Sequence, residues 1–414
     1  TFTALTSDGR VVMWGHSSYD KIGENSSGEK VNVIYNVRTM SINGNTVTAT
    51  HMDDTTISWS NNSHGVLDQV NNIEITTIFL VEIHPEQLTI NGKTLTLDNS
   101  GLISFQGSQD PNLVGEEYLP ATLKNSPPKI TNIYKTTFAF AALDVHGKVH
   151  VWGDTETAGD QAVVNSLGIG PGSAIIITDI FSTSSAFAAL DNTGKVYVWG
   201  HNSSGGNQAD VNSLDIGTGS TIRITDIVST DFTFAALDNV TGKVYVWGSD
   251  FYGGDQADVN RLGIGTLPDS TIIITDIYST SKAFAALDNT GKVHVWGQDG
   301  RGGDQDVVNS LGIGTDSTII ITDIYSTGSA FAALDNNGKV YVWGRNGSGG
   351  DQAVVNGLGI GTLPDSTIII ADIYSTGDAF AALDNNGKVY VWGRDSYGGQ
   401  LPETLTNSTI TQMF

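Results

Sequence analysis

The string AFAALDNTGKVYVWG, residues 186–200, decides the fold of this 414-residue chain because it recurs with few changes. Close copies occupy residues 138–153, 234–248, 283–297, 330–344 and 379–393, and more divergent copies occupy residues 2–15, 49–60 and 95–107. The Trp of the string, or the residue in its place, recurs every 45 to 49 residues. These positions are Trp14, Trp59, Gln106, Trp152, Trp199, Trp247, Trp296, Trp343 and Trp392. The chain is therefore predicted to consist of nine repeats.

Each repeat has the pattern of a small antiparallel sheet. AFAAL and KVYVWG alternate with period 2, and the DNTG between them supplies Asn and Gly for a tight turn, which predicts a hairpin. A β-branched run such as STIIITDIYST, residues 270–280, precedes the hairpin and predicts a further strand. The connection after Trp-Gly is polar and rich in glycine, and no stretch of ten or more residues has the apolar period of a core helix. Units of about 47 residues with three or four strands are typical of propeller blades.

The two chain ends fit the same pattern. The chain begins inside a hairpin at Phe2, and its last residues, STITQMF (408–414), correspond to the strand that precedes every other hairpin. We therefore expect the N- and C-terminal strands to share one blade. Such an arrangement closes a propeller and leaves no free sheet edge between its ends.

The repeat also resembles a known family. LDNNGKVYVWGRNGSGG (334–350), followed by LGIG at 358–361, is similar to the repeat of the regulator-of-chromosome-condensation family, and SDGRVVMWGHSSYDKIG (7–23) is close to the family form. The resemblance covers the whole chain and implies a β-propeller. It departs from the family before the alanine-leucine strand, where STxxAF strings replace the usual glycine and histidine. Family propellers normally have seven blades, whereas this chain has nine units.

The predicted fold class is therefore all-β: one closed β-propeller domain over residues 1–414, with about nine blades of roughly 46 residues each. A seven-bladed family ring with extra repeats is the alternative.

Composition excludes several functions. The chain has 49 glycines, no cysteine, 15% charged residues and a net charge of −24. Nucleic acid is not an expected partner, because phosphate binding needs clustered Lys and Arg. Without cysteine there is no disulfide, thiolate zinc site or cysteine nucleophile. No apolar run reaches the roughly 18 to 20 residues of a membrane span. The composition and the first residue, Thr1, suggest a processed protein that is secreted or at the cell surface; an effector delivered into a host cytosol is the alternative.

Acids that recur at the same position in most of the closely similar repeats are interpreted as structural. One set opens the hairpin turn and is expected to accept turn N–H groups, with calcium binding as the alternative: Asp144, Asp191, Asp238, Asp288, Asp335 and Asp384. A second set is expected to cap or tether the end of the Ile-rich strand: Asp179, Asp226, Asp276, Asp323 and Asp372. The Trp residues are interpreted as core anchors, and His150 and His294 as packing positions.

No motif indicates catalysis. GxSxG, HExxH and Walker-type loops do not occur in the sequence, so no catalytic residue, metal or cofactor is predicted. The informative positions are those that vary while the frame repeats, directly after each Trp-Gly pair. The residues predicted to bind a partner there are His201, Phe251, Tyr252, Arg301, Arg345, Arg394 and Tyr397. A second, weaker patch lies before the hairpins at Asp231, Phe232, Lys282 and Asp378.

These observations predict a non-enzymatic module that presents one face to a protein or glycan. The resemblance adds two alternatives, guanine-nucleotide exchange on a small GTPase and enzyme inhibition, since a secreted β-lactamase inhibitor resembles this repeat type. Units of 45 to 49 residues leave no insertion long enough for the wedge that exchange requires. A structural subunit or spacer of a larger extracellular assembly is a further alternative. Oligomeric state is not predicted.

Overall fold

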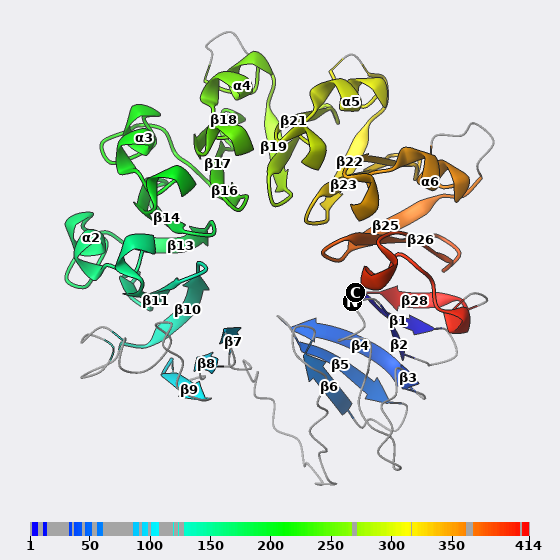
Figure 1. The fold of residues 1–414 in the computed structure, drawn as a ribbon, viewed down its shortest axis with the longest axis horizontal. Helices are drawn as coiled ribbons and strands as arrows, with labels where there is room; N and C mark the ends of the chain where they lie inside the picture. Colours follow the sequence, from blue (N-terminus) through cyan, green and yellow to red (C-terminus); the bar gives the residue numbers. More distant parts are fainter. Residues whose placement is uncertain are drawn as a thin grey trace. The chain divides into compact units, whose positions relative to one another are not determined.

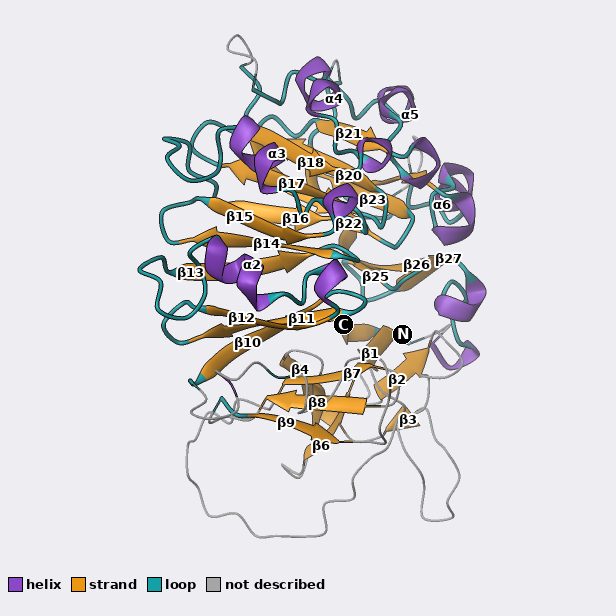
Figure 2. Cartoon of the chain, turned by 60° about the vertical axis from the view of Figure 1, so that its left-hand side comes forward, coloured by secondary structure: helices purple, strands orange, loops and turns teal. Residues whose placement is uncertain are grey.

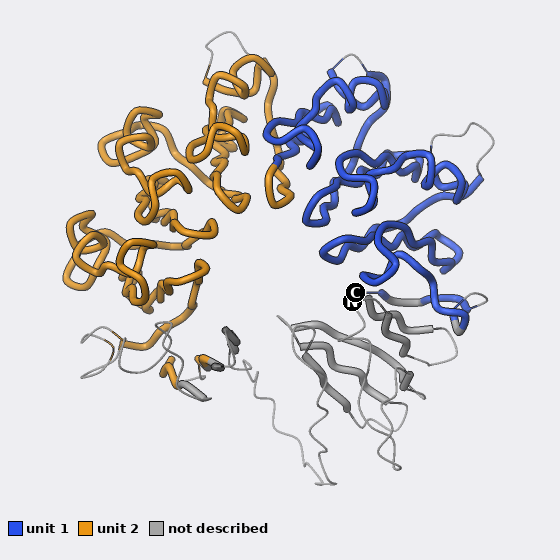
Figure 3. The backbone as a smooth tube through the Cα atoms, viewed as in Figure 1, with its two compact units in different colours: residues 1–76, 283–414 blue, residues 77–282 orange. Residues whose placement is uncertain are grey.

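The structure is a computed structural model. It describes the strands β1 to β9 with residues 101 and 102, residues 119 and 123, and then residues 128–266, 271–315, 317–361, 367–405 and 408–413. Most of the segment 7–23 that resembles the family repeat thus lies outside the described residues. The chain divides into two compact units, residues 1–76 with 283–414 (unit 1) and residues 77–282 (unit 2) (Figure 3). That residues 1–414 form one domain stays a prediction.

The described residues form nine antiparallel sheets, which are the blades of a β-propeller (Figure 1). In unit 2 the strands, blade by blade, are β7 (Glu86–Ile90), β8 (Lys93–Leu97) and β9 (Ile103–Gln106); β10 (Ile130–Lys135), β11 (Ala139–Asp144) and β12 (Val149–Gly153); β13 (Ile177–Ser182), β14 (Ala186–Asp191) and β15 (Val196–Gly200); β16 (Asp226–Ser229), β17 (Thr233–Asp238) and β18 (Lys243–Gly248); and finally β19 (Ile274–Ser279).

Unit 1 contains the two chain ends. Its strands are β1 (Phe2–Thr6), β2 (Val11–Trp14), β3 (Val33–Ile34) and β28 (Ile410–Met413); β4 (Val37–Asn43), β5 (Thr46–His51) and β6 (Thr56–Ser60); β20 (Ala283–Asp288) and β21 (Val293–Gly297); β22 (Ile321–Ser326), β23 (Ala330–Asp335) and β24 (Val340–Gly344); and β25 (Ile370–Ser375), β26 (Ala379–Asp384) and β27 (Val389–Gly393).

The terminal strands share one sheet, as predicted. Its order is β28-β1-β2-β3, and the register pairs Ala4 with Met413 and Thr6 with Ile410. The nine sheets also confirm the number of blades predicted from the Trp spacing. Each repeat of first strand and hairpin therefore forms one blade, because the first strand pairs with the hairpin that follows it along the chain.

The hairpin of each blade forms where the sequence predicted it. In β14–β15, Phe187 pairs with Trp199 and Ala188 with Val198, so the two large aromatic rings lie side by side on one face of the sheet. The same register recurs in β11–β12, β17–β18, β20–β21, β23–β24 and β26–β27. The first strand begins later than predicted: β19 starts at Ile274, whereas the β-branched run starts at residue 270.

The connection after the third strand is more ordered than the predicted polar loop (Figure 2). It begins with a 3₁₀ turn: η2 (Thr155–Thr157), η3 (Asn202–Ser204), η4 (Asp250–Tyr252), η5 (Asp299–Arg301), η6 (Asn346–Ser348) or η7 (Asp395–Tyr397). In five blades a six-residue helix follows: α2 (Gln161–Ser166), α3 (Gln208–Ser213), α4 (Gln256–Arg261), α5 (Gln305–Ser310) or α6 (Gln352–Gly357). A 3₁₀ helix, η8 (Glu403–Leu405), precedes β28. Helices this short show no apolar period, which is why the sequence did not indicate them.

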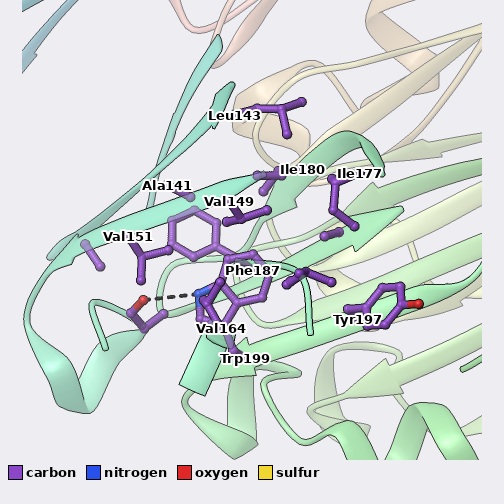
Figure 4. Close-up of a cluster of buried hydrophobic side chains, with 14 residues drawn as sticks. Ala141, Leu143, Val149, Val151, Val164, Ile177, Ile180, Phe187, Tyr197 and Trp199 are labelled. Carbon is purple, nitrogen blue, oxygen red and sulfur yellow. Dashed lines mark hydrogen bonds between the residues drawn. The ribbon is translucent and has the colours of Figure 1, made fainter. Parts of the chain in front are cut away.

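Neighbouring blades within a unit pack a small-residue face against an aromatic face. In one buried cluster, Ala139 and Ala141 of β11 lie with Phe187 and Trp199 of the next blade, and all are at most 1% exposed (Figure 4). The Trp indole also donates a hydrogen bond to the preceding blade: Trp199 Nε1 is 3.1 Å from the carbonyl oxygen of Ala158, which follows η2. Trp247, Trp343 and Trp392 make the same bond to Gly205, Gly302 and Gly349. The Trp is thus a core anchor, as predicted.

Replacing this anchor should be costly. Trp199→Ala is expected to lower the free energy of unfolding by about 3–5 kcal/mol, because it leaves a cavity and an unpaired carbonyl between two blades. Val163→Ala is the matched control, since Val163 is 41% exposed and should change stability by less than about 0.5 kcal/mol. Urea unfolding followed by far-ultraviolet circular dichroism measures both. Equal losses for the two variants would contradict the assignment.

Candidate functional site

Each blade has two ends with different roles. At the end that we name the turn end, the loop between the first and second strands lies beside the 3₁₀ turn after the third strand, because Ala186 pairs with Gly200 and Ser182 with Phe187. The opposite end, which we name the hairpin end, carries the Asp-to-Gly turn. In the blade of β13–β15 the turn end comprises residues 183–185 and 201–205.

At the hairpin end the recurrent Asp has a structural role. The Asp191 carboxylate accepts the N–H groups of Thr193 and Lys195 at 2.8 and 2.9 Å, and it also accepts the Tyr197 hydroxyl at 3.1 Å. This confirms the interpretation of these acids as turn carboxylates. Where His replaces Tyr, its Nε2 takes the hydroxyl's place, at 3.1 Å in His150–Asp144 and 3.0 Å in His294–Asp288.

The pKa values at these turns follow from the same contacts. Burial raises the pKa of Asp288, but hydrogen bonds from His294 and from the Lys292 and Thr290 N–H groups outweigh it, so that the pKa lies below its usual value. Burial beside the carboxylate raises the pKa of Tyr197. Asp288 is therefore an anionic hydrogen-bond acceptor at neutral pH and holds no proton to exchange.

The second recurrent acid lies within or at the start of the first strand and does not follow it, so the predicted position is wrong, whereas the predicted tethering role is seen at Asp179. Asp179 lies inside β13, next to a register shift between Ile177 and Asp179. Its carboxylate accepts the N–H of Ile180 at 2.8 Å and the hydroxyl of Tyr134, in the preceding blade, at 2.7 Å. A Tyr hydroxyl from one blade thus ties the first strand of the next. Sequence spacing could not reveal this contact because the two residues are 45 positions apart.

Two acids in this set have no Tyr hydroxyl from the preceding blade. The residue that corresponds to Tyr134 is Phe181 for Asp226 and Val228 for Asp276, and neither has a hydroxyl to donate. Burial raises the pKa of the Asp226 carboxyl, the charges of Asp179 and Asp276 raise it further, and the N–H of Ile227 lowers it. Despite this accumulation of acids, the described residues contain no group of three or more His, Asp or Glu that could hold a metal ion.

The loop at the turn end has a feature that the sequence analysis missed. Thr183 is buried, and its hydroxyl accepts the N–H of Ala186 at 3.1 Å and donates to the carbonyl of Ser204 in the 3₁₀ turn at 2.9 Å. Thr327 and Thr376 bond to the carbonyls of Ser348 and Tyr397 in the same way. The STxxAF string was therefore a signal for a loop fastened by its Thr, because a short hydroxyl side chain can bond nearby backbone.

These loops are also bonded to one another through the backbone. In unit 2 the N–H of Thr137 donates to Ser184, Ser184 to Asp231 and Asp231 to Ser281, at 2.8–2.9 Å. In unit 1 the N–H of Gly328 donates to Gly377 at 2.8 Å. The side chains beside these links are therefore presented from a fixed backbone.

All seven residues predicted to bind a partner lie at the turn end. His201, Arg345 and Arg394 each immediately precede a 3₁₀ turn, and Phe251, Tyr252, Arg301 and Tyr397 lie within one. His201, Phe251, and Arg345 are exposed, and the other four are half-buried. Three of the seven lie in unit 2 and four in unit 1. The seven residues thus occupy the same end of their blades, and their role in binding stays a prediction.

The structure brings the two predicted patches together around Tyr252. Its ring stacks on Phe232 at 4.9 Å between centroids and meets the edge of Phe251 at 5.0 Å. Lys282 Nζ lies 5.1 Å from the centre of the same ring. Phe251 is 67% exposed. We name Phe232, Phe251, Tyr252 and Lys282 the Tyr252 cluster; three consecutive turn-end segments contribute to it.

Two of the three predicted arginines in unit 1 make side-chain contacts with other residues of the same chain. Arg394 forms an ion pair with Asp378 at 2.9 Å and lies 5.2 Å from the Tyr397 ring centre. Asp378 also accepts the Ser348 hydroxyl at 2.7 Å, and Arg301 donates to the Ser329 hydroxyl. Arg301 and Arg394 therefore fasten the turn-end loops, which leaves less of their hydrogen-bonding capacity for a partner than the sequence predicted. No such side-chain contact is described for Arg345.

A family model matches two stretches of the chain. Residues 177–205 and 321–349 match the model described as regulator of chromosome condensation (RCC1) repeat. Each match begins with a first strand, includes the hairpin and ends in the 3₁₀ turn. The chain therefore carries RCC1-type repeats in a β-propeller fold, as the resemblance implied. No curated protein matches the sequence.

Solved structures that resemble this one are distant in sequence. Prp20p of Saccharomyces cerevisiae, studied for its binding to Gsp1p and histones, is 18% identical with a TM-score of 0.38, over 69% of this chain and 77% of that one. The ectodomain of the Physcomitrella patens receptor kinase CR4 is 13% identical with a TM-score of 0.35, over 73% and 70%. The C-terminal domain of gp131 from bacteriophage phiKZ is 10% identical with a TM-score of 0.34, over 78% and 94%.

No helix among the described residues has both the length and the apolar character to cross a membrane.

The missing Tyr hydroxyl at Asp226 gives a test of the direction in which stability changes with pH. Because its folded-state pKa is raised, Asp226 contributes stability that is present below the unfolded pKa and lost as the pH rises through the folded value. Phe181→Tyr supplies the hydroxyl that Tyr134 gives to Asp179, and it should lower the pKa of Asp226 and stabilise the protein by about 1 kcal/mol at neutral pH. The gain should shrink as the pH falls to about 4, because an increasing fraction of the carboxyl is then protonated.

Urea unfolding at the two pH values measures this gain. Asp226→Asn should abolish the dependence on pH that Phe181→Tyr introduces. A gain of equal size at both pH values would contradict a bond to the carboxylate.

Proposed function

We propose that this chain is a non-enzymatic interaction module that binds a partner protein at the turn end of its blades, with the Tyr252 cluster as the centre of the binding surface. The observation that carries the proposal is the cluster itself. It combines three aromatic rings and a cation on backbone that the turn-end hydrogen bonds hold in place. Aromatic anchors on a rigid frame are typical of binding hot spots, because little conformational entropy is lost when they bind.

The frame itself does not require these residues. In the blade of β13–β15, Ser203 and Ser204 occupy the places of Phe251 and Tyr252, and the turn has the same form. Ser204 and Ser348 fill the Tyr252 place while fully or almost fully buried. An aromatic residue that is 67% exposed, such as Phe251, gains little from folding. Phe138, also at the turn end of a unit 2 blade, is 51% exposed and extends the apolar character of this end.

A non-enzymatic role is supported by how the polar groups are used. The acids and histidines that recur in the described blades bond to turn N–H groups, Tyr hydroxyls and each other, as in Asp191 with Tyr197 and Asp288 with His294. Such acceptors are committed to the frame, and none is arranged as a nucleophile with its base. The proposal includes a site outside the cell, which the acidic, cysteine-free composition supports.

The proposal is tested by transplanting the turn of another blade. Phe251→Ser with Tyr252→Ser recreates the Ser203–Ser204 turn and should leave the melting temperature within a few degrees, because that turn is stable in the neighbouring blade. Partner capture by the immobilised full chain should fall at least about 30-fold, as for loss of a 2 kcal/mol hot spot.

Val240→Ser is the matched control. Val240 is 78% exposed at the hairpin end, so its replacement removes a comparably exposed apolar side chain from the opposite end of the same blade and should not affect capture. Capture that survives the Ser-Ser variant, or that fails equally in the control, would overturn the choice of surface.

A further inference from the structure

The outer edge of the third strand is covered in five blades by a side chain that imitates a strand. In β12 the N–H of Val151 donates to Gln161 Oε1 at 2.7 Å, and Gln161 Nε2 donates to the carbonyl of Val149 at 3.1 Å. The N–H of Val149 donates to the carbonyl of Ile169 at 3.0 Å. We name this arrangement the Gln clasp. It recurs on β15, β18, β21 and β24 through Gln208, Gln256, Gln305 and Gln352.

The clasp explains why the connection after the third strand, with its Gln and short helix, is repeated in five blades. An edge strand presents unpaired N–H and C=O groups that would otherwise pair with another chain. The Gln carboxamide offers one acceptor and one donor, the same two groups as a peptide unit. The helix that follows, capped by Asp160 in the first case, holds the Gln in place. The edge is therefore satisfied without an additional strand.

β27 has no Gln clasp. After Gly398 and Gly399 the chain continues as Gln400-Leu401-Pro402, where the five clasped blades have an Asp or Asn followed by the clasp Gln and its helix. Within the described residues, the N–H and C=O of Val389 and the N–H of Val391 have no partner on the outer side. Val391 is half-buried, whereas its equivalents Val151, Val198, Val246, Val295 and Val342 are at most 2% exposed.

In the part of the chain that the structure describes, the lysine just before β27, Lys388, also lacks a contact that the equivalent lysines of other blades make. Lys148, Lys195, Lys292 and Lys339 donate through Nζ to the carbonyl of an Ile upstream of the next first strand. Lys388 makes no such bond within the described residues; its Nζ lies 4.8 Å from the Tyr390 ring centre and its side chain is exposed. Where the structure describes it, this edge has no clasp, although Val389 is only 5% exposed and packs with Leu405, and it begins with an exposed ammonium group that is available for a charge partner.

We propose that the outer edge of β27 binds an extended segment of a partner polypeptide, which adds to the sheet as a strand and carries an acidic residue facing Lys388. The five Gln clasps show which groups this edge accepts, a carbonyl for Val391 and an N–H for Val389, and an extended backbone supplies both at strand spacing. Main-chain bonds of this kind tolerate many sequences, while the acid opposite Lys388 provides selectivity.

A second copy of this chain is the less suitable occupant. Lys388 and Arg394 lie three residues on either side of Val391, so antiparallel pairing of two copies centred on Val391 would place each copy's Lys388 opposite the other's Arg394. Like charges directly opposite in a sheet are destabilising. Each copy also carries a net charge of −24, which opposes association.

The experiment uses the full chain labelled with ¹⁵N-valine and titrated with synthetic peptides. The probes are acetylated, amidated TVTVTD and DTVTVT, with TVTVTK and KTVTVT as matched controls. The amide signals of Val389 and Val391 should shift and their hydrogen exchange should slow at least tenfold at saturation, while those of Val340 and Val342, in a clasped edge, should not change. The Asp peptides should bind about 3- to 10-fold more tightly than the Lys peptides.

Two variants separate pairing from charge. Val391→Pro removes the outward N–H without removing a bond to β26 and should abolish the shifts; Lys388→Gln should keep the binding and remove the preference for Asp. The proposal is overturned if no peptide shifts the two signals at millimolar concentration, or if their amides already exchange slowly in the free chain. It is also overturned if protein concentration alone protects them, because a second copy would then occupy the edge.

Discussion

The rest of the structure depends on the fit between a small-residue face and an aromatic face of successive blades. Ala139 and Ala141 lie with Phe187 and Trp199, and Ala186 and Ala188 with Phe234 and Trp247, in buried clusters of the same composition. A larger residue on the Ala face would separate the blades, and a smaller one on the aromatic face would leave a void. Each repeat must therefore carry the same residues at the same interval, since every blade supplies both a small-residue face and an aromatic face. In four of the described blades a hydrogen bond from the Trp indole to the preceding turn adds to this contact.

This constraint determines where the chain can vary. Side chains inside the blades and at the hairpin end are committed to packing or to the Asp-centred turns. The turn end has a fixed backbone, because Thr183 and its equivalents fasten the loop to the 3₁₀ turn, yet the side chains in the turn differ from blade to blade and several are exposed. A surface with variable side chains on a constant frame suits recognition of a partner, which is the basis of the proposed function.

The sequence predicted the blades, the shared terminal blade, the Trp anchors and the turn carboxylates, because each depends on spacing or on bonds within a few residues. It did not reveal the contact of Tyr134 with Asp179 or the Gln clasp. Gln161 reaches a strand that ended eight residues earlier, and its role appears only when the edge of that strand is visible. At the turn end, sequence variation indicated the loops of the proposed binding surface. It could not distinguish Tyr252, which gathers two rings and a lysine, from Arg394, which is paired with Asp378.

A size-exchange double-mutant cycle tests the central claim most directly. Ala188→Leu and Trp247→Phe change the size of the two sides of one buried cluster in opposite directions. If complementary size between blades governs the fold, the double variant should be more stable than the sum of the single effects predicts by at least about 1 kcal/mol. Ala188→Leu combined with Trp152→Phe, in a different cluster, should be additive. Additivity within about 0.5 kcal/mol for both pairs would contradict the account.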